Sequence, residues 1–567
     1  MMQMLLPPRV RHLWRHFWLL TKPYWTSDEK WRALGLLALV IGLSLGLVFM
    51  NVQFNSWYNV FYDTLQKLDQ EGFKAAIIKF TWLALIYIAI AVYAQYFQQM
   101  LEVKWRRWLT EHYIERWLAG QGYYRLQLTD QGTDNPDQRI AEDVVQFVSN
   151  TLSISLGLLR SVVTLASFIG ILWTLSGPIM LAGVTIPGYM VWVAIVYALI
   201  GTLFTILIGR KLVGLNFQQQ RFEADFRFGL VRIRENAESV ALYRGEGVEG
   251  ERLSARLGNV VANFWALMRM QKRLGWFTSF WSQLAIIFPI LVAAPRFFAK
   301  EITLGGLMQI NSAFGQVYGA LDFIIGSFGS LANWKAVIDR LSTFREGLEA
   351  VEKLPVLVPQ RAGEALTLSR LTVSKPDGTR LVNEPALSLS PGERMLIRGP
   401  SGCGKSTLLR ALSGIWPYAE GGVNYPAQGE VLFLSQKPYL PLGTLRMALY
   451  YPHSPRENDA DLLPLLQLAG LAHLAPRLDE TDLWSHILSL GEQQRVAFIR
   501  ALLVKPRLLF LDEASSALDA KAEAALYGAL IERLPQSILV SVGHRESLNA
   551  YHGRTLSCIA PNNWQFA

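Results

Sequence analysis

The sequence predicts a membrane-spanning all-α part of six helices, fused to a cytosolic α/β domain that carries a P-loop. Three observations support this division. Only 17% of the 567 residues are charged and 51% are hydrophobic, whereas roughly 25% of an average soluble chain is charged. Six apolar runs of roughly 20 residues, the length that crosses a bilayer, precede residue 330. Beyond Arg345, short apolar runs alternate with helical patterns and with Pro and Gly, as in an α/β domain.

Residues 1–30 are expected to form a cytosolic or interfacial elbow. Their basic residues are not followed by the short apolar stretch and small-residue cleavage site of a secretion signal. The membrane domain is expected over residues 31–345, a linker over 346–364 and the α/β domain over 365–567. The six expected spans are Trp31–Val52, Phe80–Phe97, Ser161–Ser176, Pro187–Gly209, Phe277–Phe297 and Leu304–Phe328.

Lys and Arg are unevenly distributed among the connections between these spans. They cluster before the first span, between the second and third, and between the fourth and fifth, and almost the whole net charge of +9 lies in residues 1–350. Because positively charged connections stay in the cytosol, both termini are expected there. Residues 188–288 contain no proline, so the helices around the fourth connection are expected to continue past the bilayer as stalks.

A P-loop lies between the apolar strand that ends at Arg398 and a helix that begins near Lys405. Glycines in such a loop let backbone N–H groups wrap a phosphate, while Lys405 reaches the β- and γ-oxygens and Ser406 binds Mg²⁺. The two cysteines of the chain are too few for a disulfide framework and too far apart for a metal motif. Nucleotide contacts are expected from Gly399, Pro400, Ser401, Gly402, Cys403, Gly404, Lys405, Ser406 and Thr407.

An acidic pair, Asp512-Glu513, ends a second apolar strand. Behind a P-loop this pair is typical of metal-assisted phosphoryl transfer, with Asp512 on Mg²⁺ and Glu513 activating the attacking water. His544 follows a third apolar strand, at the edge where open α/β sheets bind ligands. ATP and Mg²⁺ are therefore the expected substrate and cofactor.

Five motifs resemble, in order, those of an ABC ATPase: Walker A at 399–407, a Q-loop at Gln436, a signature at 488–492, Walker B with a D-loop at 511–519, and an H-loop at His544. The resemblance implies that Gln436 also binds Mg²⁺, that Asp519 belongs to the D-loop and that His544 contacts the γ-phosphate. It also implies a head-to-tail dimer, because one chain carries one set of motifs. The signature residues that close on the partner's nucleotide are Ser489, Leu490, Gly491 and Glu492.

Three residues depart from the common ABC pattern. The signature reads Leu-Ser-Leu-Gly-Glu rather than Leu-Ser-Gly-Gly-Gln, so Leu490 and Glu492 are exceptional. Lys375 stands where an aromatic residue usually stacks on adenine. These departures concern the rate of closure and the stacking of adenine, whereas the expected γ-phosphate contacts Ser489 and Gly491 are retained.

Segments of both parts resemble the SbmA/BacA-type ABC transporters, relatives of the peroxisomal subfamily D. They are residues 22–31, 135–143, 234–246 and 488–495. The resemblance implies a homodimeric half-transporter with an exporter-type (type IV-like) membrane fold in the bacterial inner membrane. ATP-driven closure would act on the stalks through contacts at their tips. In the plainer interpretation, the first tip is only a capped helix turn and the second only a solvated helix face. The coupling candidates are Asn135, Asp137, Asp143, Glu238 and Tyr243.

The sixth span is the most polar. At about 100° per residue, Asn311, Tyr318 and Asp322 share one face, and Gln309, Ser312 and Gln316 share another. Such groups are costly against lipid, so they are expected to border a cavity or to bond a neighbouring helix. A polar cavity favours hydrophilic or amphipathic cargo, either peptide-like or cobalamin-like. An acyl-CoA or another lipid-like compound is the alternative cargo.

Two other functional classes remain open. An ATP-gated channel or regulator would use the same motifs, whereas a soluble ABC protein acting on nucleic acid is opposed by the six spans. The expected partners are a second copy of the chain, the lipid bilayer and the transported molecule. Neither nucleic acid nor an obligatory periplasmic binding protein is expected.

Overall fold

The computed structural model describes residues 8–129, 135–181, 184–383, 387–456, 460–560 and 563–566. Its contacts divide the chain into two compact units. The helical unit comprises the residues up to 113 together with 135–342. The sheet unit comprises 114–134 and the residues from 343 onward.

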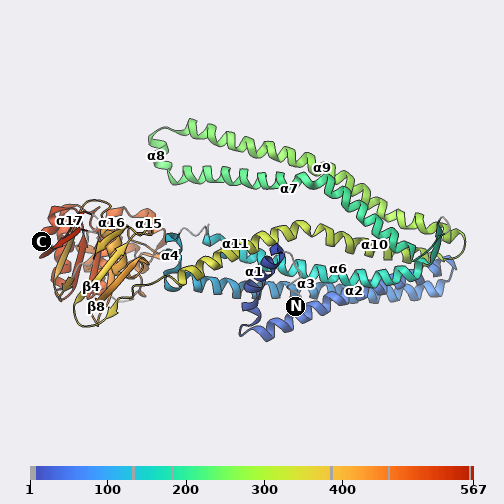
Figure 1. Ribbon diagram of the computed structural model, residues 1–567, viewed down its shortest axis with the longest axis horizontal. Coiled ribbons are helices and arrows are strands. Elements are labelled where there is room, and N and C mark those ends of the chain that lie inside the picture. Colours follow the sequence, from blue (N-terminus) through green and yellow to red (C-terminus); the bar gives the residue numbers. More distant parts are fainter. Residues whose placement is uncertain are drawn as a thin grey trace. The chain divides into compact units, whose positions relative to one another are not determined.

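The helical core of the predicted fold is confirmed (Figure 1). Four of the six expected spans lie within single helices, the fourth begins two residues before α7, and the sixth runs from α10 into the first residue of α11. Among the described residues, α2, α3, α6, α7 and α9 are long and apolar enough to cross a membrane. The long helices are α1 (Pro8–Trp25), α2 (Lys30–Gln66), α3 (Gln70–Leu118), α6 (Val144–Ser176), α7 (Tyr189–Glu235), α9 (Glu246–Phe298), α10 (Leu304–Gly326) and α11 (Phe328–Glu352). Helix α11 extends into the segment expected as a linker.

Helix α10 carries the sixth span and is more polar than the others because protein surrounds it. It packs against α2, α6, α7 and α9 and buries Ile310, Phe314 and Val317. On its α2 side, Gln309 donates to Asn55 (3.1 Å) and accepts from Asn59 (2.9 Å). Backbone amides at the start of α10 bond Asp63 and Gln66 on α2, each at 2.9 Å. The polar residues on this side therefore bond a neighbouring helix.

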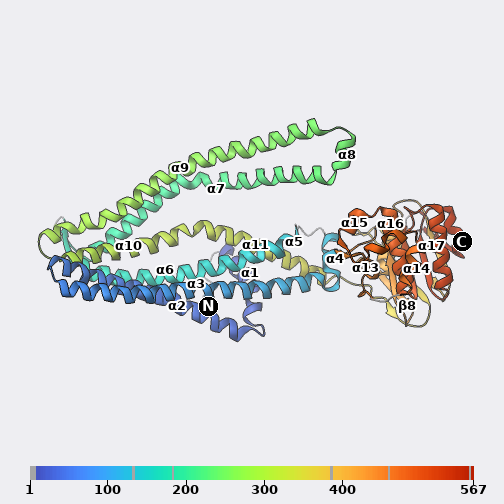
Figure 2. The ribbon, with the colours of Figure 1, turned by 180° about the vertical axis from the view of Figure 1, so that it is seen from behind.

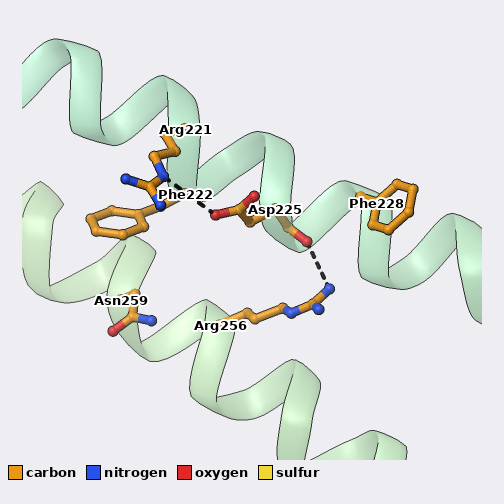
Figure 3. A pocket seen from close by; sticks show the side chains of 6 residues that line it. All are labelled: Arg221, Phe222, Asp225, Phe228, Arg256 and Asn259. Atoms are coloured by element: carbon orange, nitrogen blue, oxygen red, sulfur yellow. Dashed lines mark hydrogen bonds and ion pairs between the residues drawn. The ribbon is translucent and has the colours of Figure 1, made fainter.

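Helices α7 and α9 pair along their length and are joined by the short α8 (Ala237–Leu242), and both continue well beyond their apolar spans, as the stalk prediction requires. Asn263 on α9 donates to the Leu215 carbonyl (3.0 Å) and to Gln219 (2.8 Å) on α7. Further along, Arg256 donates to the Asp225 carbonyl (2.9 Å) across a pocket of about 420 Å³ (Figure 3). Polar bonds thus hold the two stalk helices together.

Two connections contain short elements that the sequence did not predict. A hairpin of β1 (Pro178–Leu181) and β2 (Val184–Pro187) joins α6 to α7. The connection from α3 to α6 contains η2 (Ala119–Gln121), α4 (Gly122–Leu128), α5 (Pro136–Gln138) and the π-helical turn η3 (Arg139–Asp143). This second connection is divided between the two units, since α4 belongs to the sheet unit.

The sheet unit is built on a six-stranded sheet with the order β15-β14-β7-β13-β12-β9, parallel except for β15. Its strands bury both faces, as is typical of parallel sheets. On β12, Leu508 and Phe510 face one hydrophobic cluster, and Leu509 and Leu511 face the other. The strands are β7 (Arg394–Arg398), β9 (Val431–Leu434), β12 (Leu508–Asp512), β13 (Ile538–Val542), β14 (Arg554–Ala560) and β15 (Asn563–Phe566).

Helices and a second sheet cover the two faces. Helix α12 and a mainly antiparallel sheet of β3 (Gln360–Arg361), β4 (Leu366–Ser374), β5 (Arg380–Asn383), β6 (Leu387–Leu389) and β8 (Ala419–Tyr425) share one cluster with the main sheet. Helices α13, α14, α16 and α17 share the other cluster (Figure 2). Their bounds are α12 (Lys405–Leu412), α13 (Leu445–Tyr450), α14 (Leu462–Leu468), α15 (Trp484–Ile487), α16 (Leu490–Val504) and α17 (Ala520–Arg533). The remaining short elements are β10 (Gly443–Thr444), η4 (Ala472–Arg477), β11 (Thr481–Asp482) and η5 (Glu546–Tyr551).

Candidate active site

Four neighbouring parallel strands bring the expected catalytic residues to one edge of the sheet. The P-loop follows β7, His544 follows β13, Glu513 follows β12 and Gln436 follows β9. The carboxyl ends of parallel strands meet at a common edge, where ligands of open α/β sheets bind. Residues that are more than 140 positions apart in sequence are thereby assembled into one site.

The P-loop requires the backbone freedom of glycine. The φ angles of Gly399 (149°), Gly402 (82°) and Gly404 (106°) are all positive, a conformation that residues other than glycine rarely adopt. At Gly399 a Cβ atom would also lie 2.6 Å from the Cys558 carbonyl oxygen. Lys405 is only 6% exposed, and its Nζ donates to the carbonyls of Gly399 and Pro400, both at 2.9 Å. The loop thus folds around a single buried ammonium group.

The expected Mg²⁺ ligands present hard oxygen donors. Ser406, at the start of α12, donates its hydroxyl to Asp512 at the end of β12 (3.0 Å). Burial raises the pKa of Asp512, against the opposing effects of the Ser406 hydrogen bond and nearby cations. Gln436 is exposed and lies one strand away. Hydroxyl, carboxylate and amide oxygens fit Mg²⁺, which prefers oxygen ligands.

Glu513 and His544 form the expected catalytic pair, with His544 Nε2 and Glu513 Oε1 3.5 Å apart. Glu513 has a φ of 49°, in the left-handed region that non-glycine residues seldom occupy, and such strain concentrates at functional sites. Its amide donates to the Val542 carbonyl (3.0 Å), which fixes it beside β13. The backbone therefore directs the carboxylate toward the histidine.

The signature segment begins α16 with a reciprocal cap. Ser489 accepts from the Glu492 amide (3.3 Å), while one Glu492 carboxylate oxygen accepts from the Ser489 amide (2.9 Å) and hydroxyl (2.8 Å). Burial favours a raised pKa for Glu492, but the Ser489 bonds, His473 and Arg495 together lower it. Because Glu492 replaces the usual glutamine, a carboxylate accepts the hydrogen bond of the Ser489 hydroxyl.

We expect Glu492→Gln to lower the apparent KM for ATP. An amide still caps the helix, but it removes a negative charge from beside the hydroxyl that is expected on the partner's γ-phosphate. Relief of about 1 kcal/mol of charge repulsion corresponds to a roughly fivefold lower KM. Steady-state ATPase kinetics measure it, with Glu492→Asp as the charge-retaining control. An unchanged or higher KM in Glu492→Gln would show that the carboxylate serves only as a helix cap.

The D-loop residue Asp519 caps the next helix. Its carboxylate accepts from the Ala522 amide at the start of α17 (2.7 Å) and faces Arg495 of α16 at 3.4 Å. This places Asp519 between the signature helix and α17.

The five coupling candidates occupy different environments. Asn135 and Asp137 lie at α5, and Glu238 is exposed on α8. Tyr243 is 87% exposed just after α8. Asp143 is instead 2% exposed and accepts from Arg139 and from Nε and Nη2 of Arg340 on α11. It joins two helices inside the helical unit, whereas the other four remain candidates for external contacts.

Sequence reasoning missed α4, which packs within the sheet unit. Leu128 packs against the hydrophobic cluster beneath the P-loop helix. Arg125 is 6% exposed and donates to the Gly414 carbonyl (3.4 Å), two residues beyond the end of α12, and burial lowers its pKa. Nothing in the sequence distinguishes Arg125 from its many basic neighbours. The connection between two membrane helices thus reaches the helix that follows the P-loop.

The three cavity candidates on α10 differ in exposure. Asn311 and Tyr318 are half-buried, and Asp322 is exposed. The Tyr318 ring lies 5.5 Å from that of Tyr197 on α7. The contact of this face of α10 with cargo stays a prediction.

Models of two protein families match the chain. The ABC transporter transmembrane region 2 matches residues 20–298, and the ABC transporter family matches residues 382–516. The first covers the helices through α9, and the second covers the P-loop, the signature and the acidic pair.

Curated relatives match along nearly the whole chain. An uncharacterized ABC transporter ATP-binding protein of Haemophilus influenzae is 35% identical, over 97% of this chain and 93% of the relative. The inner membrane ABC transporter ATP-binding protein YddA of Escherichia coli is 33% identical (95% and 96% coverage). The human lysosomal cobalamin transporter ABCD4 is 30% identical (96% and 94% coverage).

One solved structure shows the same fold. A bacterial Atm1-family ABC exporter with ATP bound has a TM-score of 0.71 and 17% identity, with 96% of each chain covered. This likeness supports the expected exporter-type architecture of helices followed by an α/β domain.

Proposed function

Because the chain belongs to the ABC transporter family, as a half-transporter related to subfamily D and to YddA, we propose that its homodimer couples ATP hydrolysis to the movement of a hydrophilic or amphipathic solute across the bacterial inner membrane. The chain is a multi-pass membrane protein with one ABC ATPase domain. A half-transporter implies a dimer, because one chain supplies one of the two ATPase domains.

The observation that carries the proposal is the position of α4. This helix lies in the chain between two membrane helices, α3 and α6, yet it packs in the same unit as the ATP site. Motion of the P-loop helix would therefore be passed to α4 by packing and the Arg125 hydrogen bond, and from α4 along the chain to α3 and α6. A gated channel would share this route, so the distinction between the two functions depends on whether cargo is concentrated.

The proposed chemistry uses the residues at the sheet edge. Lys405 and the loop amides hold the phosphates, and Ser406, Asp512 and Gln436 would hold Mg²⁺, which neutralises phosphate charge when bound. Glu513 accepts a proton as the water oxygen bonds the γ-phosphorus and the bond to ADP breaks. His544 contacts the γ-phosphate, while Ser489 and Gly491 of the partner subunit complete the site. Dimer closure on ATP would move the stalks, and hydrolysis would reset them.

The polar face of α10 and a cobalamin-transporting relative support a cobalamin-like or peptide-like cargo. We expect ATP-dependent, concentrative movement of such a compound in proteoliposomes that contain the purified chain. The test panel is cobalamin, a proline-rich peptide and an acyl-CoA, each with wild type and Glu513→Gln. If only the acyl-CoA moved, the cargo would be lipid-like rather than peptide-like or cobalamin-like. Movement that only equilibrates, and that persists in Glu513→Gln with ATP bound, would identify a gated channel.

A further inference from the structure

Gln494 is completely buried in the second turn of α16. A buried amide needs hydrogen-bond partners, since an unsatisfied one costs about 1–3 kcal/mol. Its Nε2 donates to the Gln436 carbonyl (2.8 Å) and to the Ser516 hydroxyl (3.1 Å), and its Oε1 accepts from the Ala517 amide (2.9 Å). The side chain is thus bonded on both of its ends.

These partners belong to different parts of the ATP site. Gln436 is the Q-loop residue, Ser516 and Ala517 lie in the D-loop, and Gln494 itself belongs to the signature helix. The D-loop and the signature also meet directly, since a Cβ atom at Gly491 would lie 3.0 Å from the Ala517 carbonyl oxygen. Gln494 extends this contact to the Q-loop.

We propose that Gln494 is a positioning residue that couples the Q-loop of one ATP site to the signature segment presented to the other. The inference rests on the proposed function, in which Gln436 serves its own site and Ser489 serves the partner's. If the Gln436 backbone moves on nucleotide binding, either α16 follows or a buried hydrogen bond breaks. Because α16 moves as a rigid helix capped by Ser489, following costs less, and the signature shifts with the Q-loop.

The adjacent glutamine provides a matched control. Gln493 is also buried, but its Nε2 donates to the carbonyls of Ser485 and Leu488, at 2.9 and 2.8 Å. Both acceptors precede α16 and lie at most eight residues before Gln493 in the sequence. Gln493 therefore has the same chemistry and depth without a bond to the Q-loop or the D-loop.

Gln494→Glu removes one bond selectively. A carboxylate still accepts from Ala517, and the Ser516 hydroxyl is able to turn and donate to it, but the Gln436 carbonyl then faces an oxygen. On the purified full-length chain we expect kcat for ATP to fall at least tenfold, while the Kd for ADP, which lacks the γ-phosphate, stays within twofold. Gln493→Glu is expected to lower Tm at least as much as Gln494→Glu does, and to keep kcat within threefold.

Two results would overturn the inference: kcat within twofold of wild type in Gln494→Glu, or a parallel loss of kcat, ADP affinity and Tm in both variants. Gln494→Met, which is uncharged and similar in length, repeats the test if the carboxylate prevents folding, and the same separation of kcat from ADP affinity is expected. The assay needs no cargo. A chain that hydrolyses ATP but moves nothing would therefore contradict the proposed function without deciding this inference.

Discussion

Glu513→Gln is expected to lower kcat for ATP hydrolysis by roughly 10²–10⁴-fold, the usual contribution of a general base. The amide keeps the size of the side chain but cannot accept a proton from water. Another side chain cannot easily take the place of Glu513 as the base. The left-handed φ of 49° and the hydrogen bond from the Glu513 amide to the Val542 carbonyl place this one side chain beside His544. Single-turnover and steady-state phosphate release measure the loss.

Nucleotide binding should survive the same change. The phosphates are held by Lys405 and the loop, not by Glu513, so we expect the Kd for ATP to stay within threefold. Glu532→Gln is the control, since it makes the same carboxylate-to-amide change at an exposed site on α17. If Glu513→Gln retained more than a tenth of wild-type hydrolysis, the base would have to be sought elsewhere at the sheet edge.

Arg125→Met is expected to reduce transport at least tenfold while ATP hydrolysis stays within about threefold of wild type. Methionine preserves the apolar stem of the side chain but removes the guanidinium. That group lies beyond the carboxyl end of α12, where helix carbonyls concentrate partial negative charge and favour a cation. Its loss should weaken the link between α4 and the P-loop helix and leave the catalytic residues in place.

Paired assays of ATPase activity and uptake in the same proteoliposomes test the separation. Arg106→Met provides the control, because Arg106 is an exposed arginine near the end of α3. Equal losses of hydrolysis and transport in Arg125→Met would mean that Arg125 supports the fold of the ATPase domain rather than coupling.

The ATP site was largely predictable because its residues follow short apolar strands. A parallel sheet brings strand ends together, so the assembly of Lys405, Asp512, Glu513 and His544 follows once those strands are recognised. Five of the spans were predictable for a similar reason, since α2, α3, α6, α7 and α9 each combine a long apolar run with few charges.

The connection from α3 to α6 was not predictable to the same degree. The chain bends before the expected tip, at Gln121, which has a φ of 55°, and again at Asn135, with a φ of 50°. Neither residue type demands that conformation, so the break that creates α4 is not evident from periodicity. Asp143 was predicted at a stalk tip because it belongs to the 135–143 segment that resembles related transporters, but its partner Arg340 lies 197 residues later. Such pairings become visible only when the helices are packed.

The polar seam between α2 and α10 has a mechanical consequence. Among the described residues, five hydrogen bonds connect Asn55, Asn59, Asp63 and Gln66 to the first turns of α10. Sliding one helix along the other would break several of these bonds at once, and the fully buried amide of Asn55 would lose its partners. The two helices should therefore behave as a single stiff lever, and any change in access to the membrane interior must be hinged at other interfaces of the bundle.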